Sequence, residues 1–331
     1  MKISFVIPAF NEEAYIGRCL ESIIGEVSKH QADAEIIVVN NASTDKTAEV
    51  AKSYPGVKVV DEPRKSAVQA RHTGYLNASG DLIAGIDADS ALTPNWFSIV
   101  QKEFNSDQKL VGLSGPYIYD DVSKRLRRAI GIYYRIAFIV YFVMKFIFRT
   151  SSMMQGGNMV IRKSALDQLG GYDLSFSFYG DDTDLARRLH SLGNVKFISK
   201  LNVYSSGRRM MGEGIFLTGF RYATNYFSTV FFKRPATKDY VDVRVTNSEG
   251  KLLAYEPANK RKEFMVLAAA ILVLMTILGT TGFLVASSVD AKETPKEFTV
   301  RMYHKFSDGD GDFDQIQAQI REAFAKKWNY R

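Results

Sequence analysis

Cysteine is almost absent from this chain, since Cys19 is the only one among 331 residues. No disulfide can form within the chain, and a zinc site built from thiolates would lack its ligands. The four histidines are not spaced in a zinc-binding pattern, and no serine or cysteine nucleophile motif occurs. The sequence therefore favours a reducing compartment and gives no support to a hydrolase.

A long apolar run is also absent at the N-terminus, where Pro8 interrupts the apolar residues and acidic residues follow. A secretory signal peptide needs a longer run and a small-residue cleavage site, so we expect the N-terminal domain to stay in the cytoplasm. The net charge of +7 is compatible with nucleic acid, an anionic membrane or a phosphate-bearing ligand. Much of the basic charge lies beside apolar segments rather than in a polar groove, which argues against nucleic-acid binding.

Hydrophobic residues make up 46% of the chain, enough for a buried core, and short apolar runs alternate with amphipathic segments over the first hundred residues. The predicted strands are 3–7, 35–39, 57–60 and 82–86. The predicted helices are 12–24, 43–52, 66–77 and 95–104. Asn11 is the expected cap of the first helix and Thr93 of the last, with Pro94 beside it. This alternation predicts an α/β domain with a parallel sheet covered by helices.

Residues 124–149 form a densely apolar stretch that keeps several basic residues. Wound as a helix, the basic residues other than Arg125 fall within an arc of about 100°. A basic face opposite a Tyr- and Phe-rich face suits a helix that lies in a membrane interface. A core helix with a solvated basic stripe explains the same pattern, and both interpretations stay open.

Residues 264–289 contain no charged residue, and about 20 apolar residues suffice to cross the hydrocarbon core of a bilayer. We predict a single transmembrane helix here. Lys260, Arg261 and Lys262 directly precede it, which favours a cytoplasmic N-terminal side. The flanking segments are then a linker at 233–263 and a C-terminal tail at 290–331.

Asp87 and Asp89 directly follow a predicted strand, so their carboxylates should emerge at the carboxyl edge of the sheet, where open α/β folds bind ligands. These hard oxygen ligands could hold Mg²⁺ or Mn²⁺ on a diphosphate. Short acids in such turns also commonly satisfy turn and cap hydrogen bonds, so the pair alone does not decide between the two roles.

Five sequence motifs, taken together, favour the metal-binding role of Asp87 and Asp89 over the turn-and-cap role. They are Ile7-Pro8-Ala9-Phe10-Asn11-Glu12-Glu13, Val38-Val39-Asn40-Asn41-Ala42-Ser43-Thr44-Asp45, Gly80-Asp81 ahead of Asp87-Ala88-Asp89, Gln155-Gly156-Gly157-Asn158-Met159 and Tyr179-Gly180-Asp181-Asp182-Thr183-Asp184-Leu185. Together they resemble the family-2 glycosyltransferases, whose GT-A fold is a Rossmann-like nucleotide-diphospho-sugar transferase domain. The resemblance implies such a domain over residues 1–232.

The resemblance also implies which residues bind the donor. These are Pro8, Ala9, Asn11 and Glu12 at the end of the first strand, Asn40, Asn41 and Asp45 in the next turn, Arg71 near the phosphates, and Asp87. Asp89, with Asp87, would hold the metal. The chain departs from the family pattern at Asn40 and Asn41, where at least one Asp is usual, and at Ala42, where Gly is usual.

The catalytic base that the resemblance implies is Asp182, beside Asp181, which replaces the usual Glu. A carboxylate there can take a proton from a sugar hydroxyl as it attacks. Placement at a helix start should keep Asp182 ionised. Gly156, Gly157 and Asn158 would form a loop beside the acceptor or diphosphate, with Asn158 as a polar contact. In the alternative interpretation, some of these acids have only a structural role as helix caps.

We therefore expect an inverting, metal-dependent transferase that moves a sugar from a UDP- or GDP-linked donor to a hydroxyl acceptor. With a membrane span beside it, the acceptor is expected to be a membrane lipid or lipid-linked glycan. Two alternatives stay open. One is a polyprenyl-phosphate glycosyltransferase, and the other is a membrane-anchored protein that binds nucleotide sugars without catalysis.

Overall fold

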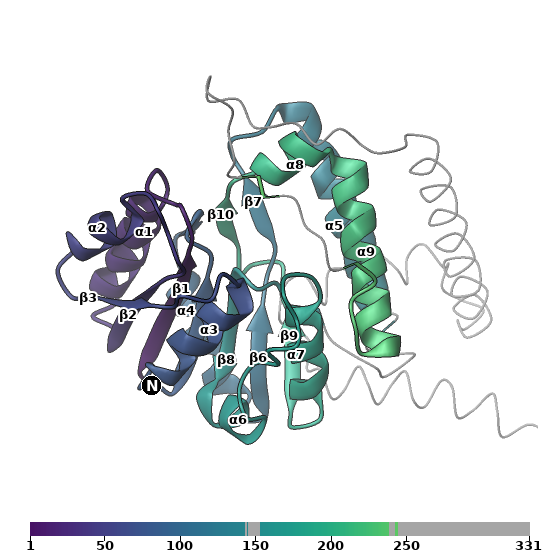
Figure 1. Cartoon of the computed structure of the whole chain (residues 1–331). Helices are drawn as coiled ribbons and strands as arrows, with labels where there is room; N and C mark the ends of the chain where they lie inside the picture. Colours follow the sequence, from purple (N-terminus) through teal and green to yellow (C-terminus); the bar gives the residue numbers. More distant parts are fainter. Residues whose placement is uncertain (143, 145–152, 238–241, 244–331) are drawn as a thin grey trace, which may run out of the picture. The chain divides into compact units, whose positions relative to one another are not determined.

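A computed structural model describes residues 1–142, 144, 153–237 and 242–243 (Figure 1). The predicted transmembrane helix at 264–289, the tail at 290–331 and most of the linker at 233–263 lie outside these residues. Within the described part, no helix has the length and apolar character needed to cross a bilayer. The span at 264–289 therefore stays a prediction.

The main sheet has seven strands in the order β3-β2-β1-β4-β8-β6-β9. Their bounds are β1 Ile3–Ala9, β2 Ala34–Asn40, β3 Val57–Asp61, β4 Leu82–Ile86, β6 Leu110–Ser114, β8 Asn158–Arg162 and β9 Asn194–Phe197. The first four strands run parallel, as predicted, but β8 runs antiparallel to both β4 and β6. The predicted parallel arrangement of the first four strands is therefore confirmed, β6 and β9 also pair in parallel, and β8 is an antiparallel strand that the sequence pattern did not indicate.

A smaller sheet orders β5 (Ser90–Leu92), β10 (Val203–Ser205) and β7 (Tyr117–Tyr119). The helices are α1 Ile16–Lys29, α2 Thr47–Lys52, α3 Ala67–Leu76, α4 Trp96–Ser106, α5 Lys124–Phe142, α6 Lys163–Gln168, α7 Asp181–His190, α8 Arg208–Glu213 and α9 Ile215–Phe232. The expected alternation of strands and helices is present. The strand β5 was not anticipated, because its three residues carry no local signal distinct from a turn.

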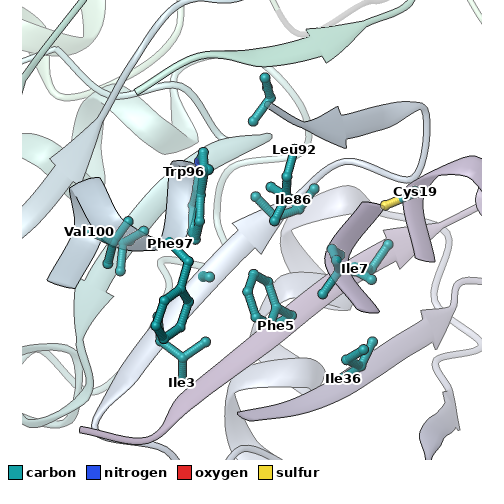
Figure 2. Close-up of a cluster of buried hydrophobic side chains, with 14 of the residues drawn as sticks. Ile3, Phe5, Ile7, Cys19, Ile36, Ile86, Leu92, Trp96, Phe97 and Val100 are labelled. Carbon is teal, nitrogen blue, oxygen red and sulfur yellow. The ribbon is translucent and has the colours of Figure 1, made fainter. Parts of the chain in front are cut away.

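Two hydrophobic clusters lie on opposite faces of the main sheet, which explains why its strands are continuous apolar runs. In β1 the residues alternate, since Phe5 and Ile7 join one cluster while Val6 joins the other. Figure 2 shows the first cluster, in which Phe5 packs with Trp96, their ring centroids 5.7 Å apart. Burying each such side chain contributes about 1.5–3 kcal/mol.

The first helix begins at Ile16, four residues later than predicted, and Asn11 does not cap it. Asn11 adopts a left-handed backbone with φ of 51°, and its Oδ1 accepts a hydrogen bond from the Thr44 amide at 2.8 Å. The short polar side chain therefore joins two neighbouring turns instead of ending its own helix.

The cap predicted at Thr93 is also wrong, because its hydroxyl donates to the carbonyl of Asn202 at 2.7 Å. Asn95 takes the capping position of α4, with φ of 69° and no side-chain cap bond. A contact from far along the chain thus decides where this helix begins.

Candidate active site

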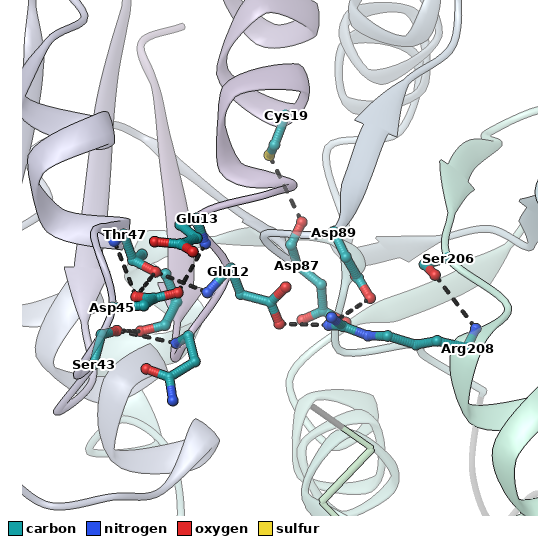
Figure 3. A network of polar contacts seen from close by, with 12 residues as sticks. Glu12, Glu13, Cys19, Ser43, Asp45, Thr47, Asp87, Asp89, Ser206 and Arg208 are labelled. Carbon is teal, nitrogen blue, oxygen red and sulfur yellow. Dashed lines mark hydrogen bonds and ion pairs between the residues drawn. The ribbon is translucent and has the colours of Figure 1, made fainter. Parts of the chain in front are cut away.

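Three parallel strands end at one edge of the main sheet and bring the predicted site residues together. Ala9 ends β1, Asn40 ends β2, and Asp87 directly follows β4. Cys19 lies behind this edge, where its thiol faces the Asp87 carbonyl at 3.7 Å (Figure 3). The carboxyl edge of an open α/β sheet is where such folds bind ligands.

The acidic turn after β4 is engaged by an arginine from α8 (Figure 3). Arg208 Nη2 lies 3.0 Å from Asp89 Oδ2 and also forms an ion pair with Glu12. Its guanidinium lies over the ring of Tyr15, 4.9 Å from the centroid. From the sequence alone Arg208 could contact the diphosphate or be a solvated surface charge, because 119 positions separate it from Asp89. The structure places it in the site.

A second arginine, Arg71 of α3, joins the two predicted acidic motifs. Its Nη1 donates to Asp181 at 2.7 Å and its Nη2 to Asp87 at 3.1 Å. Arg71 and Asp181 are both buried, whereas Asp87 is about one-third exposed. This pairing makes Asp181 a positioning group for Arg71 and leaves it poorly placed to act as a base.

The loop Gly156-Gly157 lets these side chains approach the backbone closely. A Cβ on Gly156 would stand 2.7 Å from Arg71 Nη2, and a Cβ on Gly157 would stand 2.1 Å from Asp87 Oδ2. The sequence predicted that this glycine loop would lie close to a ligand. In the structure, the side chains of Arg71 and Asp87 lie close to it. The two glycines are needed to seat Asp87 and Arg71.

Asp182 is the second residue of α7, lies beside this loop and is partly buried. Its carboxylate accepts hydrogen bonds from the Thr183 amide at 2.7 Å and the Gly156 amide at 3.3 Å. Burial, and next the charge of Asp181, raise the pKa of Asp182 to about 7. The prediction that the helix start keeps Asp182 ionised leaves out this burial, which acts in the opposite direction. A carboxyl group that titrates near neutral pH suits a general base.

Asn158 does not face the site. It is fully buried, its Oδ1 accepts from Trp96 Nε1 at 3.1 Å, and its Nδ2 donates to the carbonyls of Gly115 and Leu201. Contact with a ligand would break three hydrogen bonds, so the predicted polar contact from Asn158 is not supported. Its amide instead ties β8 to neighbouring loops.

The two asparagines predicted to bind the donor also differ, since one holds backbone together and the other lies at the site. Asn41 is buried and uses its amide on the backbone of Glu62, Arg64 and Ser66. Asn40 donates to Asp61 Oδ1 at 2.8 Å and keeps partial exposure at the strand end. Of the two asparagines, Asn40 is therefore the one placed to meet a ligand.

Asp45 braces the turns that surround this position (Figure 3). Its carboxylate accepts from the amides of Glu13 and Thr47, and these hydrogen bonds outweigh burial and lower the pKa of Asp45. Pro8 and Ala9 lie in β1 beside this turn, where the Ala9 carbonyl accepts from the Asn41 amide at 2.8 Å. These residues shape the backbone at the predicted nucleotide position.

The acids of the site fit a divalent cation only with help from a ligand. Among the described residues, no three His, Cys, Asp or Glu side chains are arranged so that they could hold a metal ion by themselves. Mg²⁺ in phosphate-handling sites commonly takes one or two carboxylates and completes its coordination with substrate phosphates. Asp87 and Asp89 supply two such carboxylates from one turn, next to the backbone of Gly157. The residues therefore fit a metal that arrives with a diphosphate.

Sequence reasoning missed the residues that hold this arrangement together. Tyr117 accepts from the Gly157 amide at 3.0 Å, and Tyr134 accepts from the Tyr117 amide at 3.1 Å. The only sequence signal for them is the density of tyrosines around the predicted helix at 124–149.

Comparisons with known proteins agree with this geometry. The model of the family described as glycosyl transferase family 2 matches residues 4–170. A dolichyl-phosphate beta-glucosyltransferase of Trichomonas vaginalis is 34% identical over 120 residues, covering 32% of this chain and 36% of that protein. A dolichyl N-acetyl-alpha-D-glucosaminyl phosphate 3-beta-D-2,3-diacetamido-2,3-dideoxy-beta-D-glucuronosyltransferase of Methanococcus voltae is 30% identical over 139 residues, covering 39% and 42%.

The chain thus spans less than half the length of these relatives. Among solved structures, a mannosyltransferase of Pyrobaculum calidifontis in complex with GDP-Man and Mn²⁺ is similar, with a TM-score of 0.55 and 18% identity. The likeness covers 99% of this chain and 88% of that one. At this identity the likeness supports the fold alone. Because the family model matches half of the chain and the fold agrees, this chain belongs to glycosyl transferase family 2, with a GT-A fold.

Proposed function

We propose that this protein is an inverting, metal-dependent glycosyltransferase that moves a sugar from a nucleoside-diphosphate donor to an acceptor hydroxyl. The observation that carries the proposal is the position of Asp182. Its carboxylate is held by the Gly156 amide, and the next residue, Gly157, lies against Asp87 at the carboxyl edge of the sheet. A base and a diphosphate site therefore adjoin one another.

In the proposed reaction the acceptor oxygen attacks C1 of the donor sugar from the face opposite the diphosphate. The new C1–O bond forms as the bond from C1 to the diphosphate oxygen breaks. The electron pair of that bond leaves with the nucleoside diphosphate, and Asp182 takes the acceptor proton. Single displacement inverts the configuration at C1.

Asp87 and Asp89 would hold the cation, Mn²⁺ or Mg²⁺, which when bound offsets charge that develops on the leaving diphosphate. The Pyrobaculum neighbour, which shares the fold, is described in complex with Mn²⁺. Arg71 orients Asp87 through its hydrogen bond at 3.1 Å. Arg208, now on Asp89, has the planar fork of donors that suits phosphate oxygens, so we assign it to the diphosphate once the metal occupies Asp89.

A hydroxyl acceptor is favoured by the charges around Asp182. Carboxylates outnumber guanidinium groups there, and both Arg71 and Arg208 are already paired with acids. An anionic phosphate acceptor would be repelled and would need no base. Transfer to a polyprenyl phosphate is the second candidate, since the Trichomonas relative is named for that activity.

We also propose that the protein works at a membrane. In α5 the residues Lys124, Arg125, Arg127, Arg128 and Arg135 are exposed, and Ile132 among them is 55% exposed. An exposed basic face with an apolar residue suits an anionic lipid surface. A single span at 264–289, with residues 1–232 on the cytoplasmic side, would anchor the protein to the membrane that carries a lipid-linked acceptor.

The test is a screen of detergent-solubilised full-length protein for release of nucleoside diphosphate. Donors would include UDP-glucose, UDP-galactose, UDP-N-acetylglucosamine and GDP-mannose, with Mn²⁺ or Mg²⁺ and then with a chelator. We expect metal-dependent release from one donor that is lost in Asp89→Ala and kept in Asp33→Asn, a matched change of an exposed acid before β2. No release from any donor, even with membrane lipid extract, would overturn the proposal.

A further inference from the structure

Several tyrosines from separate elements lie near the loop at 155–157 that holds Asp182, and the reaction described above uses none of them. The rings of Tyr133 and Tyr134 in α5 lie 5.9 Å apart at 70°, edge to face. Tyr222 of α9 makes the same kind of contact with Tyr179, which precedes α7, at 5.9 Å and 70°. We call Tyr133, Tyr134 and Tyr222 the tyrosine platform.

The platform adjoins α9. The Tyr133 ring lies 3.4 Å from where a Cβ on Gly219 would stand, an ordinary van der Waals distance, so the ring packs against α9. Burial, the Tyr134 hydroxyl and then the charge of Asp182 raise the pKa of Tyr133.

Hydrogen bonds fix the platform to the catalytic loop. The Tyr134 hydroxyl accepts from Gln155 Nε2 at 3.1 Å and from the Tyr117 amide. The Tyr117 hydroxyl in turn accepts from the Gly157 amide. Two neighbouring backbone positions thus hold both the base, through Gly156, and the platform, through Gly157. Such coupling pre-organises a binding surface relative to a reacting group.

The platform keeps accessible ring surface, since Tyr133 and Tyr134 are half-buried and Tyr222 is 38% exposed. Flat aromatic faces match a pyranose ring, whose C–H groups pack on a ring face. A lipid phosphate needs a cation instead. Arg209 and Arg221, of α8 and α9, both pair with Glu213, and the exposed arginines of α5 belong to the basic face described above.

We infer that the tyrosine platform is an acceptor subsite that stacks a pyranose ring of a glycolipid or glycan and presents one ring hydroxyl to Asp182. This inference rests on the proposed transferase function and narrows its acceptor to a molecule that already carries a sugar.

The experiment uses full-length protein in detergent with the donor found by the screen. The acceptor probes are n-octyl glycosides of glucose, galactose, mannose and N-acetylglucosamine, and farnesyl phosphate. We expect transfer to at least one octyl glycoside and none to farnesyl phosphate. Tyr133→Leu should raise the acceptor KM about tenfold, while Tyr133→Phe, which keeps the ring face, stays within about twofold. Tyr54→Leu, a matched change of a tyrosine whose hydroxyl donates to Glu21 of α1, should leave the acceptor KM unchanged.

Slow hydrolysis of the donor without acceptor distinguishes failure of the acceptor subsite from failure of the transferase function. Unchanged hydrolysis in Tyr133→Leu, with the higher acceptor KM, supports the subsite. Transfer only to farnesyl phosphate, or an acceptor KM that does not respond to Tyr133→Leu, overturns the subsite while the transferase stands. A wild type that turns over no donor at all overturns both.

Discussion

Arg71 and Asp181 form a buried ion pair at 2.7 Å. Because Asp181 is held in this pair, it cannot share the role of base with its neighbour Asp182. Neighbouring carboxylates in one motif therefore have different tasks. Asp181 fixes Arg71, and through it Asp87, while Asp182 keeps contact with the loop at Gly156.

Breaking this pair should cost stability. Arg71→Met leaves the Asp181 carboxylate buried without its partner, and such losses amount to about 3–5 kcal/mol. Denaturant unfolding of the full chain measures the change. The double variant Arg71→Met, Asp181→Leu removes both charges and should regain most of the loss. Equal destabilisation of the single and double variants would show that the ion pair is not the cause.

The activity should depend on pH through Asp182. Its pKa of about 7 means that the carboxylate is mostly protonated below that pH, so kcat/KM should rise with pH through about 7 and then level. Asp181→Asn removes the neighbouring charge that raises this pKa, and the rise should move to lower pH. A pH profile that stays in place in this variant would contradict the assignment.

The same pKa predicts a stability effect. An acid whose folded-state pKa lies above its unfolded value loses stability as pH rises between the two, because the folded state resists ionisation. Asp182→Asn should therefore unfold at higher denaturant than the wild type at pH 8, and the difference should shrink toward pH 4. In the transfer assay this variant should lose about 10²–10⁴ in rate with a hydroxyl acceptor. Retained transfer to farnesyl phosphate would point to the phosphate alternative.

Gly157→Ala should disturb the metal site without unfolding the domain. Its Cβ would stand 2.1 Å from Asp87 Oδ2, so the carboxylate must turn away and lose its alignment with Asp89. We expect weaker binding of Mn²⁺ with donor, measured by calorimetry. Gly25→Ala in α1 is the matched control, since nothing lies within 4 Å of its added methyl group. Equal Mn²⁺ affinity in the two variants would exclude this role for Gly157.

Arg208→Gln should change metal binding in the opposite direction when the donor is absent. Arg208 occupies Asp89 at 3.0 Å, so a cation must compete with it for that carboxylate. Mn²⁺ titrations followed by electron paramagnetic resonance should show tighter binding in the donor-free variant, with turnover reduced because the diphosphate loses its contact. Arg18→Gln, which removes an exposed pair with Asp120, is the control. Unchanged Mn²⁺ affinity in Arg208→Gln would argue against this competition.

The parts of the fold that local patterns determine could be predicted from the sequence. The four parallel strands and the position of Asp87 at a strand end follow from apolar runs and the acids that end them. The antiparallel β8 could not be predicted, because strand direction is decided by pairing with β4 and β6 rather than by its own residues.

In the site too, local sequence patterns predict only part of the arrangement, and contacts from distant segments decide the rest. Motifs located the acids, but the partner of each acid comes from a distant segment, as Arg71 and Arg208 do. The pKa of Asp182 depends on burial, which the helix-start argument could not include. Asn41 and Asn158 have the residue type of ligand contacts, yet their amides hold backbone together.

The pairing of β6 with β8 has an evolutionary consequence. Ser114 and Met159 are register partners, so the chain leaves the sheet and re-enters it at adjacent points. The segment between them carries β7, α5, the first two platform tyrosines and, at its end, the Gly156-Gly157 loop that seats Asp87, while Asp87 and Asp89 themselves lie outside it. Loop-closure entropy grows slowly with length, so the excursion can be lengthened or shortened at small cost. Descendants of one ancestor that keep Gly156 and Gly157 could thus acquire new acceptors by changes in this one segment, with the residues that activate the sugar donor inherited intact.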